Sequence, residues 1–282
     1  MKNIFTTVFL FCLTFILHAQ VKTPQPSPWS KVEQKVGLTH VTLEYSRPSM
    51  KGRTIFGDLV PYGKLWRTGA NASTKITFDT STIIDGQELK AGTYAIYTIP
   101  NKDAWEVYLY TDSNLWGAPK TLDPEKIAAK TVVNTEKNAF HLESFTIDFS
   151  NLNNAGAEIE ILWDNISIFI PFTVPTAVAV QASIDKTMAG TPKAQDYYAA
   201  ANYYLEINKD MKQAQQWIDK AIEMTKDKPK FWYLRRQALI HAKNGDTKGA
   251  IKAAKASIKY AEKAGNDDYV KMNNDSLKEW GA

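Results

Sequence analysis

Five cationic side chains lie in the segment from Ser46 to Asn71, SRPSMKGRTIFGDLVPYGKLWRTGAN, which we call the basic loop. It is too rich in glycine and proline to form a strand or a helix. An arginine guanidinium binds a carboxylate or a phosphate through two parallel hydrogen bonds, and it also stacks on aromatic rings. Arginines beside a tryptophan could therefore cradle an anionic small molecule or glycan, such as an acidic sugar, or a peptide carboxylate. The candidate ligand-binding residues are Arg47, Arg53, Trp66, Arg67 and Asn71.

The same basic loop alternates glycine, proline and apolar residues, as an ordered loop does when it closes one end of a β-sandwich. In that interpretation the apolar side chains form a plug, Asp58 pairs with one cation, and the arginines donate to carbonyl groups of the loop. Lys51 and Lys64, on flexible stems, are then solvated. The sequence is compatible with both interpretations. The plug would consist of Ile55, Phe56, Leu59, Val60, Leu65 and Trp66.

Two histidines lie close in sequence to carboxylates. His40 precedes Glu44 by four residues in LTHVTLEYS, and His141 precedes Glu143 by two in FHLESF. On a strand, each pair would point to one face of the sheet. If the two strands were adjacent, these side chains could bind zinc or iron. The alternative, which we favour, is that they are ordinary polar residues on the solvent face of a sheet.

Other catalytic patterns are missing from the sequence. It has no Gly-x-Ser-x-Gly motif, no His-Glu-x-x-His motif and no glycine-rich phosphate loop that opens a helix. The only cysteine, Cys12, lies in an N-terminal apolar run. We therefore predict no cofactor, no metal and no catalytic residue. A hydrolase or metal-dependent enzyme that uses His40, Glu44 and His141 is the alternative.

Residues 1–19 have the features of a secretory signal peptide, with an apolar run from Ile4 to Leu17 and a small residue at the cleavage point. The run is too short for a stable membrane span. Phe11 stands before Cys12, where a lipoprotein signal would need a small residue. We predict an exported protein of the periplasm or the cell surface that is not a lipoprotein.

The charge and cysteine content narrow the class of protein further. The 282 residues include 34 Lys and Arg against 30 Asp and Glu, and loss of Lys2 with the leader leaves a formal charge of +3. Such a mild balance gives no indication of nucleic-acid binding. The cysteine-free mature chain must be stabilised by packing and not by disulfides.

Residues 20–175 have the patterns of short strands separated by tight turns at Gly37, Asp85-Gly86, Asn101 to Asp103 and Asn153-Asn154. About eight such strands without a long helix predict an antiparallel β-sandwich domain. The segment DPEKIAAKT, from Asp123, is the exception and predicts one or two helical turns between strands. The predicted strands are SKVEQKVG, LTHVTLEYS, TKITFDTSTII, GTYAIYTI, WEVYLYT, FHLESFTIDF, AEIEILW and ISIFIPFTV.

Residues 176–282 change to a composition rich in Ala, Lys, Gln and Asp, and strand patterns disappear. Start and stop signals divide this part into helices. An internal repeat places NKDMKQAQQWIDKAIEM over NGDTKGAIKAAKASIKY at an offset of 36 residues, which aligns Asp210 with Asp246 and Ala214 with Ala250. The predicted helices span residues 177–188, 193–207, 210–226, 229–243, 247–264 and 267–280.

This repeat resembles the tetratricopeptide repeat, a helical hairpin with small residues at fixed positions. The alternative is an unrelated bundle of helical hairpins. Both predict stacked antiparallel helices, and repeat arrays of this kind bind a protein or peptide partner. The aromatic residues that could line such a groove are Trp217, Phe231, Trp232 and Tyr233.

The N-terminal half is similar to the bacterial domain of unknown function 2911 family. The resemblance rests on YSRPSMKGRTIFG, LVPYGKLWRTGAN, LKAGTYAIYTIP and WEVYLY, in that order, and covers about Trp29 to Val174. It implies an exported protein, often of Bacteroidetes-type bacteria, with no defined activity. Members of that family commonly have an acidic residue after Gly-Ala-Asn, where this chain has Ala72.

Together these patterns predict an α+β protein with an antiparallel β-sandwich followed by a small all-α domain of helical hairpins. The leading hypothesis is a non-catalytic binding or assembly protein. Its helical half would engage a protein or peptide, and its basic loop an anionic group.

Overall fold

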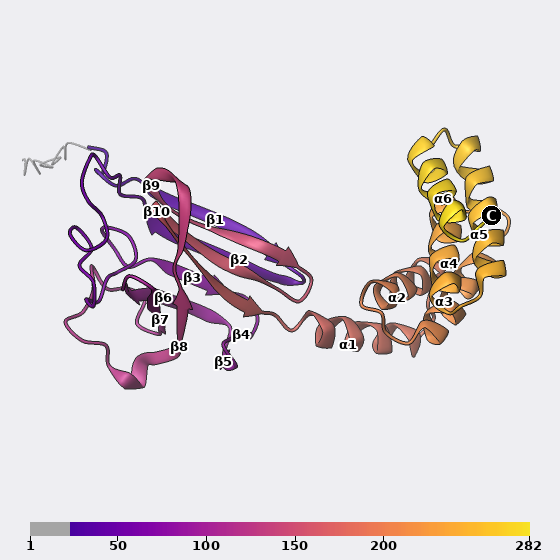
Figure 1. Ribbon diagram of the computed structural model, residues 1–282. Coiled ribbons are helices and arrows are strands. Elements are labelled where there is room, and N and C mark those ends of the chain that lie inside the picture. The colour runs from indigo at the N-terminus through magenta and orange to yellow at the C-terminus, as the bar shows by residue number, and fades with distance from the viewer. Residues whose placement is uncertain (1–22) are drawn as a thin grey trace, which may run out of the picture. The chain divides into compact units, whose positions relative to one another are not determined.

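The computed structural model describes residues 23–282, which divide into two compact units after Thr176. We call residues 23–176 the β unit and residues 177–282 the helical unit (Figure 1). All the hydrophobic core clusters consist of residues from Val32 onward. The predicted signal peptide, residues 1–19, lies outside the described residues.

The β unit contains two sheets in which every paired strand is antiparallel to its neighbour. The larger sheet has the order β1-β2-β3-β6-β7-β8 and the smaller the order β5-β4-β10-β9. The strands of the larger sheet are β1 (Trp29–Val36), β2 (Thr39–Ser46), β3 (Lys75–Phe78), β6 (Gly92–Ile99), β7 (Ala104–Tyr110) and β8 (Ile127–Asn134). Those of the smaller sheet are β4 (Thr82–Ile84), β5 (Gln87–Leu89), β9 (Glu136–Asn153) and β10 (Gly156–Thr173).

One hydrophobic core joins the two sheets. Leu43 and Val107 of the larger sheet share it with Ile147 and Ile161 of the smaller one, and all four are almost completely buried. Burying a side chain of this size contributes about 1.5–3 kcal/mol. Apolar residues alternate along β2 and β9, so only one face of each of these strands enters the core. Strand β7 is buried on both faces, one in this core and the other in a smaller cluster of tyrosines. The predicted α+β class, with antiparallel sheets followed by helices, is therefore confirmed.

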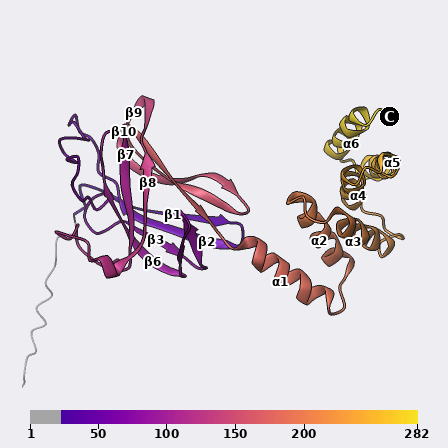
Figure 2. The same cartoon turned by 60° about the horizontal axis from the view of Figure 1, so that its bottom comes forward.

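A long hairpin of β9 and β10 replaces the separate short strands that the sequence predicts here (Figures 1 and 2). The sequence predicts two strands, AEIEILW and ISIFIPFTV, separated at Asp164-Asn165. In the structure β9 pairs with β10 on both sides of this point, and the register shifts at Asp164, which has a left-handed φ of +53°. A bulge absorbs the irregular residues without ending the strand. The predicted turn at Asn153-Asn154 does join the two strands.

The prediction of one or two helical turns from Asp123 is only partly right. Asp123 accepts a hydrogen bond from the Glu125 N–H at 3.1 Å and caps a single short turn, Pro124–Lys126. Ile127 then begins β8, whose residues Ala129 and Val133 face the core. The alanine-rich stretch favours a helix locally, but pairing with β7 overrides that preference.

The helical unit contains six helices, close to the predicted ranges, that follow one another as antiparallel hairpins. Helix α2 packs on α3 and α4 on α5, while α2, α4 and α6 contact one another in succession. Within residues 23–282, no helix has both the length and the apolar character needed to cross a bilayer. The helices are α1 (Thr176–Met188), α2 (Ala194–Glu206), α3 (Met211–Glu223), α4 (Phe231–Lys243), α5 (Thr247–Lys263) and α6 (Asp267–Glu279).

The internal repeat aligns structurally equivalent residues of α3 and α5. Asp210 and Asp246 both cap their helices, accepting from the N–H three residues later at 3.0 and 2.9 Å. Ala214 and Ala250 are both fully buried. Because these small side chains occupy matching positions, each helix can lie close to its neighbour.

Candidate functional site

A cleft of about 350 Å³ opens where the basic loop crosses the end of the β unit. Twelve residues line it, and they include three cations and two tryptophans but no Asp, Glu or His. Its size is within the range of small-molecule sites. The lining residues are Pro26, Ser27, Pro48, Lys51, Arg53, Leu59, Val60, Trp66, Arg67, Gly69, Ala70 and Trp163.

The basic loop is fixed to the larger sheet at Trp66. The backbone N–H of Trp66 donates to the Thr98 carbonyl at 2.8 Å, and the backbone N–H of Thr98 donates to the Trp66 carbonyl at 3.0 Å. The chain then turns at Gly69, which has a φ of +144°. A Cβ at Gly69 would lie 3.0 Å from Thr74 Oγ1 and 3.1 Å from the Ser46 carbonyl oxygen. Only glycine suits both this conformation and this space.

Aromatic rings form the floor of the cleft. The rings of Trp66 and Trp163 stack at 6.0 Å with an interplanar angle of 17°, and Phe56, Trp105 and Phe145 pack edge-on around them. The Trp66 indole N–H donates to the Gly69 carbonyl at 3.1 Å. That of Trp163 donates to the Glu143 carbonyl at 3.2 Å. Both indole donors are used inside the protein, so neither tryptophan offers the cleft a polar group. Trp163 is only 1% exposed and packs beneath Trp66, which is half-buried and supplies the ring surface of the floor.

Arg67 is half-buried at the cleft, where one of its nitrogens donates to the Asn71 carbonyl at 2.9 Å. A guanidinium has five N–H donors. For Arg67, the described residues supply an acceptor to one of the five. Gly117 lies directly against it, because a Cβ there would be 3.2 Å from Arg67 Nη1. The guanidinium is thus held in place while most of its donors remain available.

The backbone near Gly117 is held by a buried hydroxyl network. Tyr97 Oη and Ser73 Oγ are 2.8 Å apart, and Tyr97 Oη donates to the Gly117 carbonyl at 3.3 Å. Burial raises the pKa of Tyr97, although the hydrogen bond with Ser73 and the charge of Arg67 act in the opposite direction. Tyr97 therefore stays a neutral donor behind the Arg67 guanidinium.

Arg53 and Lys51 complete the positive side of the cleft. Arg53 donates from Nε to the Met50 carbonyl at 2.8 Å and from Nη2 to the Ser49 carbonyl at 2.6 Å. These two bonds orient the guanidinium and leave three donors. Lys51 is exposed, and its backbone N–H donates to Glu143 Oε1 at 2.8 Å.

No carboxylate among residues 23–282 lies within 4.0 Å of the charged nitrogens of Lys51, Arg53 or Arg67. Asp58, which the sequence suggested as a partner for one of the cations, is exposed and makes no such pair. None of these three cations therefore forms an ion pair within the described part of the chain, and the nearest carboxylate contact is that of Glu143 with the Lys51 backbone.

Two of the predicted ligand-binding residues have structural contacts and do not line the cleft. Arg47 donates from Nε to the Phe145 carbonyl at 3.0 Å and from Nη2 to Thr146 Oγ1 at 2.6 Å, which ties the end of β2 to β9. Asn71 donates from Nδ2 to the Ser27 carbonyl at 3.1 Å and to Ser46 Oγ at 3.2 Å. Three predicted residues, Arg53, Trp66 and Arg67, do line it.

The plug interpretation also describes part of the basic loop. Ile55 and Val60 are buried in the main core, and Phe56 and Trp66 pack against it. Leu65 packs on a smaller cluster around Tyr97. Leu59 is 42% exposed at the cleft. The loop therefore closes the end of the sandwich with its apolar residues and presents cations beside them.

The structure does not gather the proposed metal ligands His40, Glu44 and His141. The backbone N–H of His40 donates to Asp79 Oδ1 at 2.8 Å, whereas the His141 ring bonds to Asp164. On β2, Glu44 is paired in register with Lys31 of β1 on one side and with Lys75 of β3 on the other. In residues 23–282 no three His, Cys, Asp or Glu side chains are grouped so that they could hold a metal ion.

A second cavity, of about 480 Å³, lies within the helical unit along α2, α4 and α6. The predicted groove aromatics are elsewhere. Tyr233 is buried and stacks on Tyr198 at 4.2 Å, and Trp217 packs edge-on against Tyr204. These rings belong to the core of the helical unit. The groove is lined by Leu205, Glu206, Arg236, Leu239, Ala242, Lys243, Glu279 and Trp280.

Sequence reasoning missed Lys51 and Trp163 as cleft residues. The sequence analysis interprets Lys51 as solvated because its stem is flexible. Trp163 follows the basic loop by about a hundred residues. Only the pairing of β9 with β10 and the shared core bring it under Trp66. No local pattern could have identified it.

Comparison with known proteins agrees with the β unit. A family model described as "protein of unknown function (DUF2911)" matches residues 27–172, slightly more than half of the chain. The match ends before the helical unit. No curated protein and no solved structure matches the chain. The chain therefore belongs to the DUF2911 family of proteins of unknown function.

Proposed function

We propose that this chain is a non-catalytic binding protein whose β unit takes an anionic ligand in the cleft of the basic loop. One observation carries the proposal: Lys51, Arg53 and Arg67 line a cleft with an aromatic floor and with no carboxylate in its lining. Such a site attracts a negative group and leaves guanidinium donors to bind it.

The ligand class is a carboxylate on a small, partly apolar body. The two oxygens of a carboxylate match the paired N–H groups of Arg67 or Arg53. The half-buried ring of Trp66, supported from beneath by Trp163, would pack against a sugar ring or a side chain. An acidic sugar and the C-terminus of a peptide share this chemistry. The lining has no carboxylate and no imidazole to act as a general base, which favours binding over catalysis.

Isothermal titration calorimetry with glucuronate and with a dipeptide that has a free C-terminus tests the proposal. Glucose and the amidated dipeptide are the neutral controls. Arg53→Ala and Arg67→Ala should each weaken binding by about 10-fold to 100-fold, the range expected for hydrogen bonds to a charged group. Lys64→Ala removes an exposed cation of the same loop outside the cleft and should leave binding unchanged. Failure of both anions to bind the wild-type chain would reject the proposal.

We further propose that the helical unit is a tetratricopeptide-like module that holds a protein or peptide partner. Two observations support this proposal. Helices α2, α4 and α6 follow one another along one groove. The helix-capping aspartates and the small buried residues recur at an offset of 36 residues. Helical arrays bind partners along surfaces built in this way. A photo-crosslinker at Leu239 should capture a discrete partner in the native cell, and one at the exposed Lys212 on α3, outside the groove, should not.

The location that suits these roles is the bacterial periplasm or cell surface. The leader-like sequence of residues 1–19 supports export. Mass spectrometry of the protein from its native cells should show the chain beginning at Gln20. A mature protein that retains Met1 would contradict export through this leader.

A further inference from the structure

Five lysines form a row along the exposed face of α5. Their spacing of four, three, four and four residues keeps them on one face of a helix with 3.6 residues per turn. All five are exposed, and the row is about 22 Å long at 1.5 Å per residue. We call this set the lysine row: Lys248, Lys252, Lys255, Lys259 and Lys263.

The lysine row has no partners within the described part of the chain. None of its members forms an ion pair with residues 23–282, and its one aromatic contact is Lys259 over the Tyr260 ring at 5.9 Å. Lysines three and four residues apart on a helix repel each other. Lys248 also lies in the first turn of α5, near the positive end of the helix dipole. Lys263, in the last turn, is favoured by the helix dipole, so the unfavourable part of the row is its mutual repulsion and its first member.

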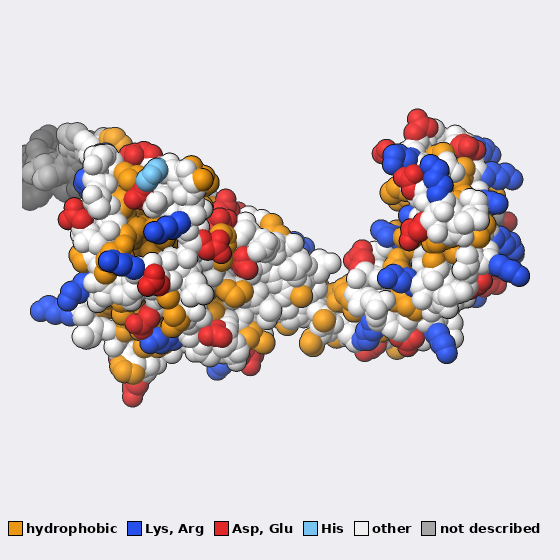
Figure 3. All heavy atoms as spheres, in the orientation of Figure 1, with side chains coloured by type: hydrophobic (Ala, Val, Ile, Leu, Met, Phe, Trp, Pro, Cys, Tyr) orange, Lys and Arg blue, Asp and Glu red, His pale blue; other side chains and the backbone are white. Residues whose placement is uncertain are grey.

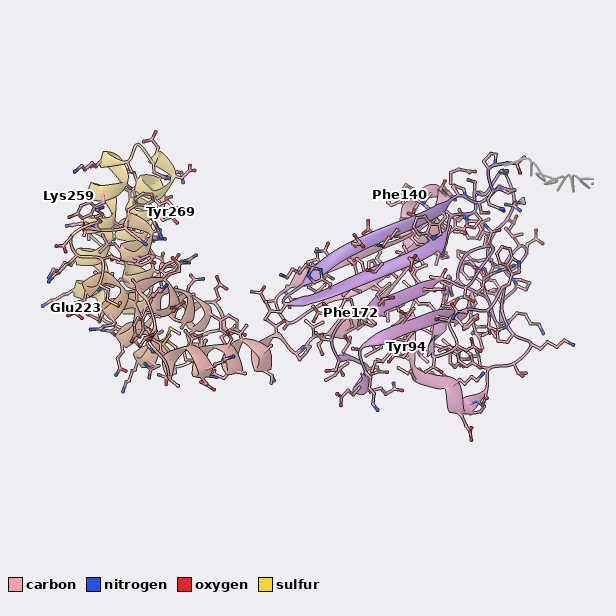
Figure 4. All side chains as sticks on the ribbon, turned by 180° about the vertical axis from the view of Figure 1, so that it is seen from behind. Tyr94, Phe140, Phe172, Glu223, Lys259 and Tyr269 are labelled. Carbon is pink, nitrogen blue, oxygen red and sulfur yellow. The ribbon has the colours of Figure 1, made fainter. Side chains whose placement is uncertain are left out.

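The fold does not require these charges. The internal repeat aligns α3 with α5, and both bury small or apolar residues on the opposite face. Where α5 has Lys252, Lys255 and Lys259, α3 has Gln216, Asp219 and Glu223. Figure 4 shows Glu223 and Lys259 on the same side of the helical unit. Because glutamine and acidic residues fit these three equivalent positions, the three lysines are a property of α5 and not of the repeat, whereas Lys248 has a lysine, Lys212, at its equivalent position.

We propose that the lysine row is a docking surface for an anionic lipid membrane. Figure 3 shows the basic side chains following α5 along the edge of the helical unit, so they can meet a flat surface together. No member of the row lines a cavity described above. Lysine ammonium groups act as hydrated point charges, which suits lipid headgroups better than a shaped site does.

The chemistry of the row argues against a protein partner. Interface cores are depleted in lysine and are built around buried aromatic and arginine anchors. The apolar side of α5, with Ala250, Ala254 and Ala261, is already buried in the helical unit. The helix consequently cannot insert into the bilayer, and contact would be peripheral and electrostatic. Such binding weakens as salt increases.

Vesicle co-sedimentation tests the proposal, with the chain from residue 23 onward, which contains all the described core clusters. The vesicles contain phosphatidylcholine alone or with 30% phosphatidylglycerol, at low and at high salt. We expect binding to the anionic vesicles only, and weaker binding at high salt. The triple variant Lys252→Gln, Lys255→Gln, Lys259→Gln should bind about 100-fold less tightly, at about fivefold per lysine.

The matched control removes three exposed lysines elsewhere in the helical unit, with Lys186→Gln, Lys212→Gln and Lys226→Gln. It changes the net charge equally and should lower binding less than tenfold. Equal losses in the two triple variants, or no binding to anionic vesicles, would overturn the proposal. Binding of dextran sulfate that depends on the lysine row, without vesicle binding, would also overturn it and would assign the row to a soluble polyanion.

Discussion

At the scale of single residues, the arginines of the basic loop have two different roles. The guanidinium of Arg47 joins the end of β2 to β9 through two hydrogen bonds. The guanidinium of Arg67 lies beside the cleft and donates one hydrogen bond, to the Asn71 carbonyl. Both are half-buried. Residue type and exposure therefore do not separate these two arginines; what differs is that the acceptors of Arg47 lie on another strand, β9, whereas Arg67 lines the cleft.

Replacing Arg47 with Ala should lower the free energy of unfolding by about 2 kcal/mol, because hydrogen bonds from a charged donor are lost. Arg67→Ala should lower it by less than about 1 kcal/mol, because one bond is lost. Urea denaturation followed by tryptophan fluorescence checks both values. Equal losses for the two variants would contradict the division of roles.

The raised pKa of Glu160 predicts that the stability of the protein depends on pH. Burial, and then the nearby carboxylates of Asp148 and Glu158, raise its pKa above the ordinary value of 4.5, and Asp148 lies directly opposite on β9. A carboxyl whose pKa is raised by folding binds its proton more tightly in the folded state. Its ionisation therefore costs stability, which falls as the pH rises from the ordinary pKa through the raised one.

Glu160→Gln should raise the free energy of unfolding at pH 7 by about 0.5 kcal/mol, since like charges on facing strand positions are destabilising. At pH 4 the variant and the wild type should agree more closely. Denaturation at both pH values measures the difference. A variant less stable than the wild type at pH 7 would show that the Glu160 carboxylate has a favourable partner.

At the scale of elements, most strands and all six helices follow from local pattern. Asp210 and Asp246 mark helix starts, and Gly37 and Asp85-Gly86 mark turns between strands. The failures are β8 and the joined β10, where pairing with a neighbouring strand overrides an alanine-rich stretch and a polar interruption. Neither partner strand can be inferred from the residues involved.

The candidate site was predictable in the same uneven way. The basic loop was evident from its composition, and Arg53, Trp66 and Arg67 line the cleft as its interpretation as a cradle requires. The contribution of Trp163 was not evident, since it depends on how the two sheets pack. The roles of Arg47 and Asn71 depend on backbone carbonyls, which sequence patterns do not place.

Gly69→Ala tests whether the turn after Trp66 positions the cleft. The left-handed φ and the short distances to Thr74 and Ser46 predict a loss of stability of more than about 1 kcal/mol. The substitution should also move the Gly69 carbonyl, which accepts a hydrogen bond from the Trp66 indole N–H. The tryptophan fluorescence of the folded state should therefore change. Gly52→Ala is the control, because no atom lies within 4 Å of its added Cβ. It should change the stability but not the fluorescence.

At the scale of the whole molecule, each unit has its own buried core. The clusters of the β unit contain no residue after Val174, and those of the helical unit none before Val180. Two cores without shared residues predict two folding units.

Residues 177–282, expressed alone, should therefore fold cooperatively. Circular dichroism should show a helical spectrum and a single thermal transition. A fragment with no transition would show that the helical unit depends on the rest of the chain.

The edge position of β1 in the larger sheet has a consequence for self-association. An edge strand presents unpaired backbone groups to any other extended chain, and charged side chains discourage such pairing. Lys31, Glu33 and Lys35 alternate along β1 and are exposed, and Lys31 pairs with Glu33. A second copy that tried to extend the sheet would have to bring its own charged row against this one. The charged edge thus protects the folded β unit from aggregating through strand addition.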